Sequence, residues 1–129
     1  MKSFLIVAFS LLTTFGMAQA PIGAKVNKAL SNGNASALKS MMMLEVDLSL
    51  LDEEGMYPAD QVVKMLERFF SSNPVVSFDV RHKGTSKLDD HYRIGELKTK
   101  SGLYRVTYFL KNTPSGVRIK QFRVESADD

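Results

Sequence analysis

The spacing of apolar residues predicts helices in the first half of the chain and strands in the second. Apolar residues recur at helical spacing over 22–30, and again over 35–42 behind Asn34, a suitable N-cap. The period becomes two over 44–50, which predicts a strand with Leu44, Val46, Leu48 and Leu50 on one face. A third, strongly amphipathic helix is predicted from near Pro58 to before Pro74.

Four further strands are predicted over 75–82, 91–99, 103–111 and 117–125. Short segments rich in Gly, Ser and Pro separate them, so we expect an antiparallel meander. The alternation of the last strand changes parity between Ile119 and Phe122, which predicts a bulge near Lys120 and Gln121.

The acidic run Asp52, Glu53 and Glu54 is followed by Gly55 and lies where the first strand must stop. We interpret these four residues as a solvated turn. The run lacks the spacing of a calcium loop and has no neighbouring histidine for acid–base chemistry.

Residues 1–18 have the features of a secretory signal peptide: Lys2, a short apolar run and a small-residue end. Cleavage after Ala18 is favoured over cleavage after Ala20, because Pro21 follows the latter. The remaining ~110 residues suffice for one domain, expected over 22–125, with a flexible tail at 126–129. The chain has no cysteine, so we expect a soluble secreted or periplasmic protein without disulfides.

Charge is distributed unevenly along the chain. Residues 44–70 hold seven acids and two bases, whereas 91–123 hold eight bases and one acid, Glu96. Part of the surface is therefore expected to attract anions.

The order of elements resembles the cystatin-like α+β fold of the nuclear transport factor two-like superfamily. It is most similar there to a family of small secreted bacterial proteins of unknown function. The resemblance covers about residues 24–125 and rests on LLDEEGMY, the pair Phe69–Phe70, HKG at 82–84, YRIGEL from Tyr92, and GLYRVTYFLK from Gly102. Pro58 departs from the small polar residue expected at its position.

The resemblance implies a cone in which N-terminal helices pack on a curved, mainly antiparallel sheet and a pocket forms between them. The candidate pocket residues are Tyr57, Tyr92, Glu96, Tyr104 and Tyr108. The tyrosines have a plain alternative role as core or rim residues. Glu96 is a weak catalytic candidate: if it shares an apolar face with Tyr92 and Ile94, burial would suit it to proton transfer. A bulge at Gly95 would instead turn it outward.

His82 and His91 bracket the first hairpin loop and are weak candidates for a metal site, although their spacing matches no compact ligand motif. The methionine run 41–43 is better explained by packing than by copper binding. We expect no cofactor, no nucleic-acid partner and no membrane span.

The leading hypothesis is a non-enzymatic binding or assembly module that uses the cone or the exposed sheet face. Its expected partners are a second copy bound through the sheet, a small apolar ligand, or an acidic partner in the cell envelope. Arg93, Arg105, Lys111 and Arg118 are the candidate basic face. One alternative is a small cofactorless enzyme resembling ketosteroid isomerases or polyketide cyclases, with Glu96 as base. Another is a purely structural accessory protein.

The signal-peptide interpretation predicts that the exported protein begins at Gln19. Mass spectrometry of protein recovered outside the cytoplasm should give the mass of residues 19–129. Recovery of the intact chain from the cytoplasm would contradict the prediction, and a protein that begins at Pro21 would move the cleavage site to Ala20.

Overall fold

The computed structural model describes residues 20–127; the expected signal peptide and the last two residues lie outside this range. The helices are α2 (Ala20–Ser31), α3 (Ala35–Leu38), the 3-10 turn η1 (Lys39–Met41) and α4 (Ala59–Ser72). The strands are β1 (Met42–Leu50), β2 (Glu53–Pro58), β3 (Val75–Thr85), β4 (His91–Thr99), β5 (Gly102–Thr113) and β6 (Gly116–Ser126). Within the described range, no helix is long and apolar enough to cross a membrane.

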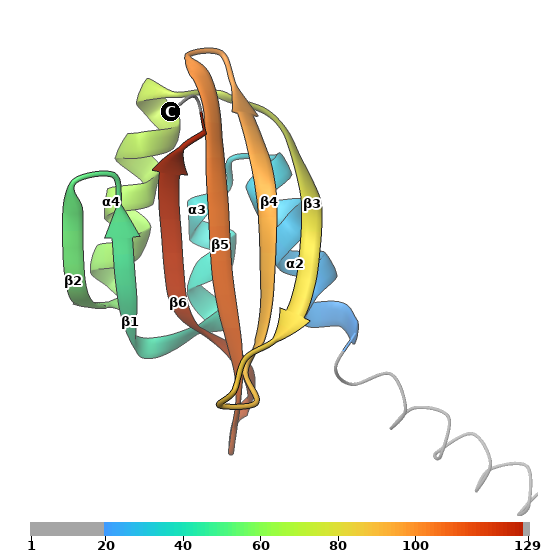
Figure 1. Cartoon of the computed structure of the whole chain (residues 1–129). Helices are drawn as coiled ribbons and strands as arrows, with labels where there is room; N and C mark the ends of the chain where they lie inside the picture. The colour runs from blue at the N-terminus through green and yellow to red at the C-terminus, as the bar shows by residue number, and fades with distance from the viewer. Residues whose placement is uncertain (1–19, 128–129) are drawn as a thin grey trace, which may run out of the picture.

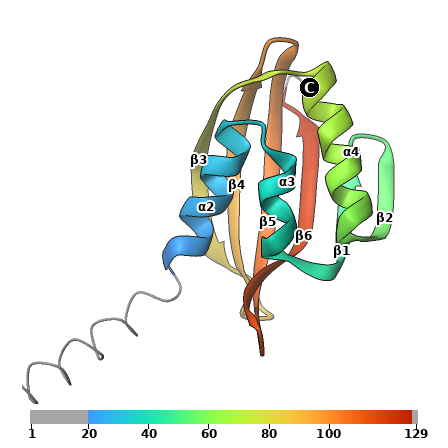
Figure 2. The same cartoon turned by 180° about the vertical axis from the view of Figure 1, so that it is seen from behind.

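All six strands form one curved sheet in the order β2-β1-β6-β5-β4-β3. β1 and β6 run parallel and the other neighbours are antiparallel. The three helices lie together on one face of the sheet and leave the other face uncovered (Figures 1 and 2). The expected cystatin-like α+β architecture is confirmed.

The hydrophobic core fills the space between the helices and the sheet. α4 turns six apolar residues inward, as its helical pattern predicts: Val62, Val63, Met65, Leu66, Phe69 and Phe70. The sheet opposes them with alternate residues of its central strands, among them Leu97, Val106, Tyr108, Ile119 and Phe122, all with no exposed surface. This packing is the main stabilising contribution in a domain without disulfides.

Tyr108 joins the sheet to α2 by a hydrogen bond inside this core. Its hydroxyl donates to Oδ1 of Asn27 at 2.7 Å, and its ring stacks on Phe122 with 6.5 Å between ring centroids. Burial raises the pKa of Tyr108 to about 12, and the charge of nearby Arg93 opposes this only in part. The tyrosine is thereby held neutral.

Asp60 links α4 to η1 at the surface. It lies in the first turn of α4, where a carboxylate interacts favourably with the helix dipole, and Lys39 Nζ lies 2.5 Å from its Oδ1. The hydrogen bond and charge of Lys39 lower the pKa of Asp60 below its ordinary value.

The interpretation of residues 52–55 as a turn is correct for Asp52 and wrong for Glu53, Glu54 and Gly55. The chain turns at Leu51 and Asp52, where Leu51 has a φ of 54°, and residues from Glu53 onward form β2 against β1. β2 is an edge strand, and four of its six residues are exposed, two of them the acids Glu53 and Glu54. It therefore lacks the apolar alternation that identifies a half-buried strand.

Leu44 does not share the buried face of its strand but is 92% exposed. β1 pairs with β6 at Met42 and again only at Asp47, and the residues between them bulge away from the ladder. The predicted bulge in the last strand is confirmed: Phe109 pairs with Gln121 and Leu110 with Ile119, which leaves Lys120 as the extra residue.

The substitution Tyr108→Phe should lower the free energy of unfolding by about 1 kcal/mol at neutral pH, because Asn27 loses its partner. The difference from wild type should narrow between pH 10 and 12. In that window the unfolded tyrosine ionises first, so the stability gained from a folded-state pKa of about 12 is progressively lost as pH rises. Urea denaturation across this pH range measures both effects.

Tyr92→Phe is the matched control, since its hydroxyl makes no hydrogen bond to any described residue and lies on the uncovered face of the sheet. A Tyr108→Phe protein whose stability difference is constant from pH 7 to 12 would contradict the assignment.

Candidate functional site

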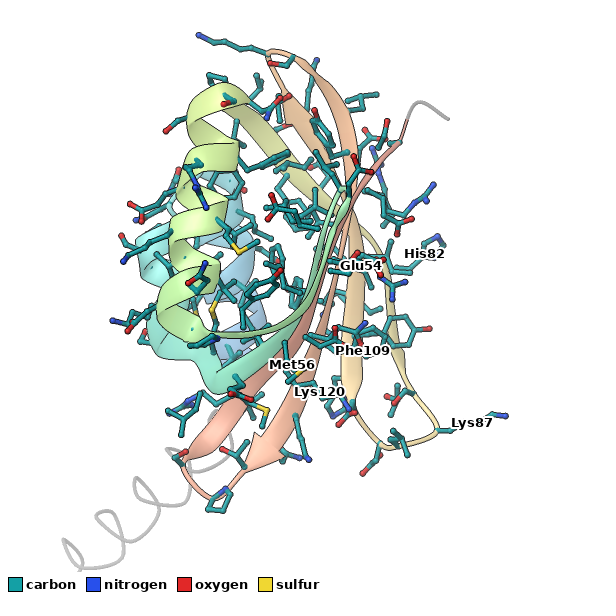
Figure 3. The ribbon with its side chains drawn as sticks, turned by 90° about the vertical axis from the view of Figure 1, so that its left-hand side faces the viewer. Glu54, Met56, His82, Lys87, Phe109 and Lys120 are labelled. Atoms are coloured by element: carbon teal, nitrogen blue, oxygen red, sulfur yellow. The ribbon has the colours of Figure 1, made fainter. Side chains whose placement is uncertain are left out.

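The uncovered face of the sheet, here called the outer face, is the main candidate for a functional surface. Strand pairing places every second residue on it. Figure 3 shows the sheet from its edge, with Glu54, Met56, His82 and Phe109 on the side away from the helices. These residues come from three of the six strands, β2, β3 and β5.

An aromatic strip lies on the outer face over β5, β4 and β3. The rings of Tyr92 and Phe109, on paired positions of β4 and β5, lie 5.4 Å apart. Tyr92 extends over Gly84 of β3, where a Cβ atom would overlap its hydroxyl. Ile94 is the next outer residue on β4. Glycine is thus required at 84 for the ring to lie flat on the sheet.

Charge on the outer face is segregated by strand. The outer positions of β1 and β2 carry acids without a base: Glu45, Asp47 and Glu54. The outer positions of β5 and β6 carry mainly bases: Arg105, Lys111 and Arg123, with Glu125 as the one acid paired across from Arg105. The acidic and basic halves of the sequence therefore become neighbouring strips of one surface.

One ion pair on this face is largely removed from water. Lys120, the bulged residue of β6, contacts Oδ2 of Asp90, the residue just before β4, across β5. The side chain of Asp90 is 7% exposed and that of Lys120 is 28% exposed. The backbone N–H of Asp90 also donates to Ser86 Oγ, which fixes the loop that carries it.

Glu96 lies on the outer face and faces away from the cone. Glu96 shares a face with Tyr92 and Ile94, as the catalytic hypothesis required. That face is the uncovered one, however, so Glu96 does not enter the core. Its carboxylate pairs with Arg81 at 3.4 Å, and its side chain is 41% exposed. Gly95 does not bulge β4 away from β5; it instead leaves room for the Phe78 ring on the inner face.

The five pocket candidates are not brought together. Tyr57, Tyr104 and Tyr108 face the helices, whereas Tyr92 and Glu96 lie on the outer face. The inward tyrosines act in packing. Tyr104 donates a hydrogen bond to Asn73 Oδ1 at 3.1 Å and packs edge-on against Phe69.

The four residues expected to form one basic face are not all on the outer face of the sheet. Arg105 and Lys111 lie on the outer face, but Arg93 pairs with Tyr108 on the inner face and reaches the side of α2 at Gly23. Arg118 folds back on the β5–β6 turn, where its guanidinium donates to the carbonyls of Ser115 and Val117 at 2.9 Å. Sequence reasoning assigned no role to Arg81, Lys120 or Arg123, although their alternation with apolar residues could have placed them.

His82 and His91 occupy positions on opposite faces. His82 pairs with Ile94 on the outer face, whereas His91 pairs with Leu110, which is buried on the inner side. Nδ1 of His91 lies 3.4 Å from the hydroxyl of Thr85. In residues 20–127, no three His, Asp or Glu side chains are grouped so as to hold a metal ion.

Comparison with known proteins identifies the family. Residues 24–125 match the model described as "Domain of unknown function (DUF4783)". The chain belongs to the DUF4783 family. No curated protein matches it.

DUF4783 structures from two Bacteroides species are similar to this chain. The protein of Bacteroides fragilis YCH46 is 28% identical with a TM-score of 0.75; the match covers 80% of this chain and 96% of that one. The protein of Bacteroides uniformis ATCC 8492 is 27% identical with a TM-score of 0.76, covering 82% and 97%.

More distant neighbours agree on the fold. An NTF-2 like protein of unknown function from Silicibacter pomeroyi DSS-3 is 11% identical with a TM-score of 0.59, covering 88% of this chain and 96% of that one. At this identity the likeness shows the fold alone, which is the nuclear transport factor two-like fold expected from the sequence.

The substitution Lys120→Met should lower the free energy of unfolding by about 1–3 kcal/mol, because it leaves the carboxylate of Asp90 unpaired and mostly buried. Arg81→Met, which breaks the exposed pair with Glu96, should change it by less than about 1 kcal/mol. Parallel urea denaturation of the two variants compares a shielded pair with an exposed one. Equal decreases in the free energy of unfolding of the two variants would show that the burial of Asp90 does not strengthen its ion pair with Lys120.

Proposed function

We propose that this DUF4783 protein is a non-enzymatic assembly module whose outer sheet face binds a second copy of the chain. The observation that supports this most directly is the difference between the two faces of the sheet, of which one is packed against the helices and the other is uncovered. The inner face is occupied by core side chains such as Tyr108 and Phe122, whereas the outer face presents the Tyr92–Phe109 strip without a covering element. Aromatic side chains on an open surface are typical of protein interfaces.

The charge pattern favours one orientation of the two copies. A two-fold axis that runs parallel to the strands, between β1 and β6, places β1 of one copy over β6 of the other and β2 over β5. The acids of β1 and β2 then lie over the basic strands β6 and β5 of the partner, and the reverse contact is made at the same time. A two-fold axis across the strands would place acids on acids, at a cost in free energy.

Apolar residues fit the same orientation. Met56 lies on the outer face of the acidic strand β2 and is 60% exposed. With the axis along the strands, Met56 of one copy moves toward the aromatic strip of the other. A thioether packs well against aromatic rings, and this contact would bury exposed apolar surface.

The position of Glu96 supports an assembly module over the enzyme alternative. A general base in a cone pocket has to be shielded beside a hydroxyl or amide that steadies the developing charge. Glu96 instead pairs with Arg81 on the open face, and the hydroxyls of Tyr104 and Tyr108 on the inner face donate to Asn73 and Asn27. We also propose that the module works outside the cytoplasm, which rests on residues 1–18 alone.

Charge reversal on either strip of the outer face should prevent homodimer formation. Mixing a variant of the acidic strip with a variant of the basic strip should restore association. Asp47→Lys/Glu54→Lys makes the acidic strip basic, and Arg105→Glu/Arg123→Glu makes the basic strip acidic. Each double variant alone should sediment as a monomer at concentrations where wild type is a dimer, because like charges then face one another. An equimolar mixture should form a heterodimer, measured by analytical ultracentrifugation.

Glu67→Lys is the control for charge reversal, since Glu67 is exposed on α4 on the opposite side of the sheet. This variant should dimerise like wild type. A wild-type protein that stays monomeric up to millimolar concentration, or a mixture that does not associate, would overturn the proposal.

A further inference from the structure

A second concave surface lies on the helical side of the molecule, between α2 and α3. It has a volume of about 450 Å³, within the usual range for small-molecule sites. Ile22 and Ala29 from α2 and Ala37 and Met41 from the α3–η1 segment form its apolar part. The two alanines keep this part of the groove open because their side chains are short.

Three cations surround this pocket and no acid lines it. Lys25 and Lys28 lie three residues apart on α2 and so project from the same side of the helix. Arg118 completes the set from β6. Among the described residues, none of these three cations forms a salt bridge; the ion pairs present use Lys39, Arg81 and Lys120 instead.

The polar groups of the pocket are positioned by the local structure. The guanidinium of Arg118 uses two donors on the carbonyls of Ser115 and Val117, which fix it and leave the rest of its five N–H groups available. Oδ1 of Asn34 accepts from the Ala37 N–H at 3.2 Å and from Ser36 Oγ at 2.9 Å. Its amide NH₂ is therefore free to donate to a ligand.

We infer that the α2–α3 pocket binds a small amphipathic organic anion, with an acidic head group among Lys25, Lys28 and Arg118 and an apolar body along Ala29 and Met41. Uncompensated cations next to an apolar surface favour a ligand that has both characters. The site does not depend on the proposed function, because α2 and α3 lie on the opposite side of the sheet from Phe109.

The probe for this inference is 8-anilinonaphthalene-1-sulfonate, which joins one sulfonate to an apolar body. Titration of the purified protein, followed by fluorescence and by amide chemical-shift changes, should give saturable binding with shifts over residues 22–41 and at Arg118. The double variant Lys25→Gln/Lys28→Gln should weaken binding by roughly tenfold, and added salt should weaken wild-type binding in the same direction.

Lys64→Gln/Lys83→Gln is the matched control, since it removes the same charge from exposed positions outside this pocket. It should keep the wild-type affinity within about twofold. The neutral analogue N-phenyl-1-naphthylamine should bind wild type and the Lys25/Lys28 variant equally.

Three results would overturn the inference: no saturable binding, an equal loss in the control variant, or shifts confined to the aromatic strip at Tyr92 and Phe109. Sedimentation of the Lys25→Gln/Lys28→Gln protein keeps the two proposals apart. Its association state should match wild type, whereas the charge-reversal variants of the outer face should lose association and keep probe binding.

Discussion

Strict alternation along paired strands is the constraint on which the rest of this structure depends. Each side chain of a strand points to one of the two faces of the sheet. Because β4, β5 and β6 are paired, residues at paired positions of these three strands point to the same face. Once Val106, Tyr108 and Leu110 are buried, the residues that alternate with them along β5 must face outward. The core therefore also determines which side chains are left for a partner or ligand.

The same constraint explains why the elements were largely predictable from the sequence and the site was not. Apolar periodicity gave the positions of α4 and of four strands to within a few residues, because these elements bury one side against a core. It also located the β6 bulge, where the parity of the apolar residues changes. Periodicity divides the residues of a strand between two faces, however. It does not say which of these faces packs against the helices, so it could not place Glu96.

Edge strands and bulges are the elements that sequence periodicity missed. β2 has β1 as its single neighbour, so its side chains need not be apolar, and its acids suggested a turn. Leu44 fits the apolar alternation of its strand, yet the interruption between Met42 and Asp47 in the β1–β6 ladder exposes it. The error at Leu44 has a tertiary cause: the parallel pairing of β1 with β6 joins segments over 70 residues apart, and no local pattern encodes that register.

Arg118 lies next to both the α2–α3 pocket and the outer face of the sheet. Substitution of Arg118 therefore cannot separate ligand binding at the pocket from assembly through the outer face. It lines the α2–α3 pocket and also a groove of about 550 Å³ that includes Met43, Leu44 and Met56, the last of which belongs to the outer face. Its guanidinium is also part of the β5–β6 turn, through Ser115 and Val117. A change at Arg118 would therefore alter the turn, the pocket and the rim of the outer face together. Lys25 and Lys28 line the pocket without entering the groove, so they distinguish ligand binding from assembly where Arg118 cannot.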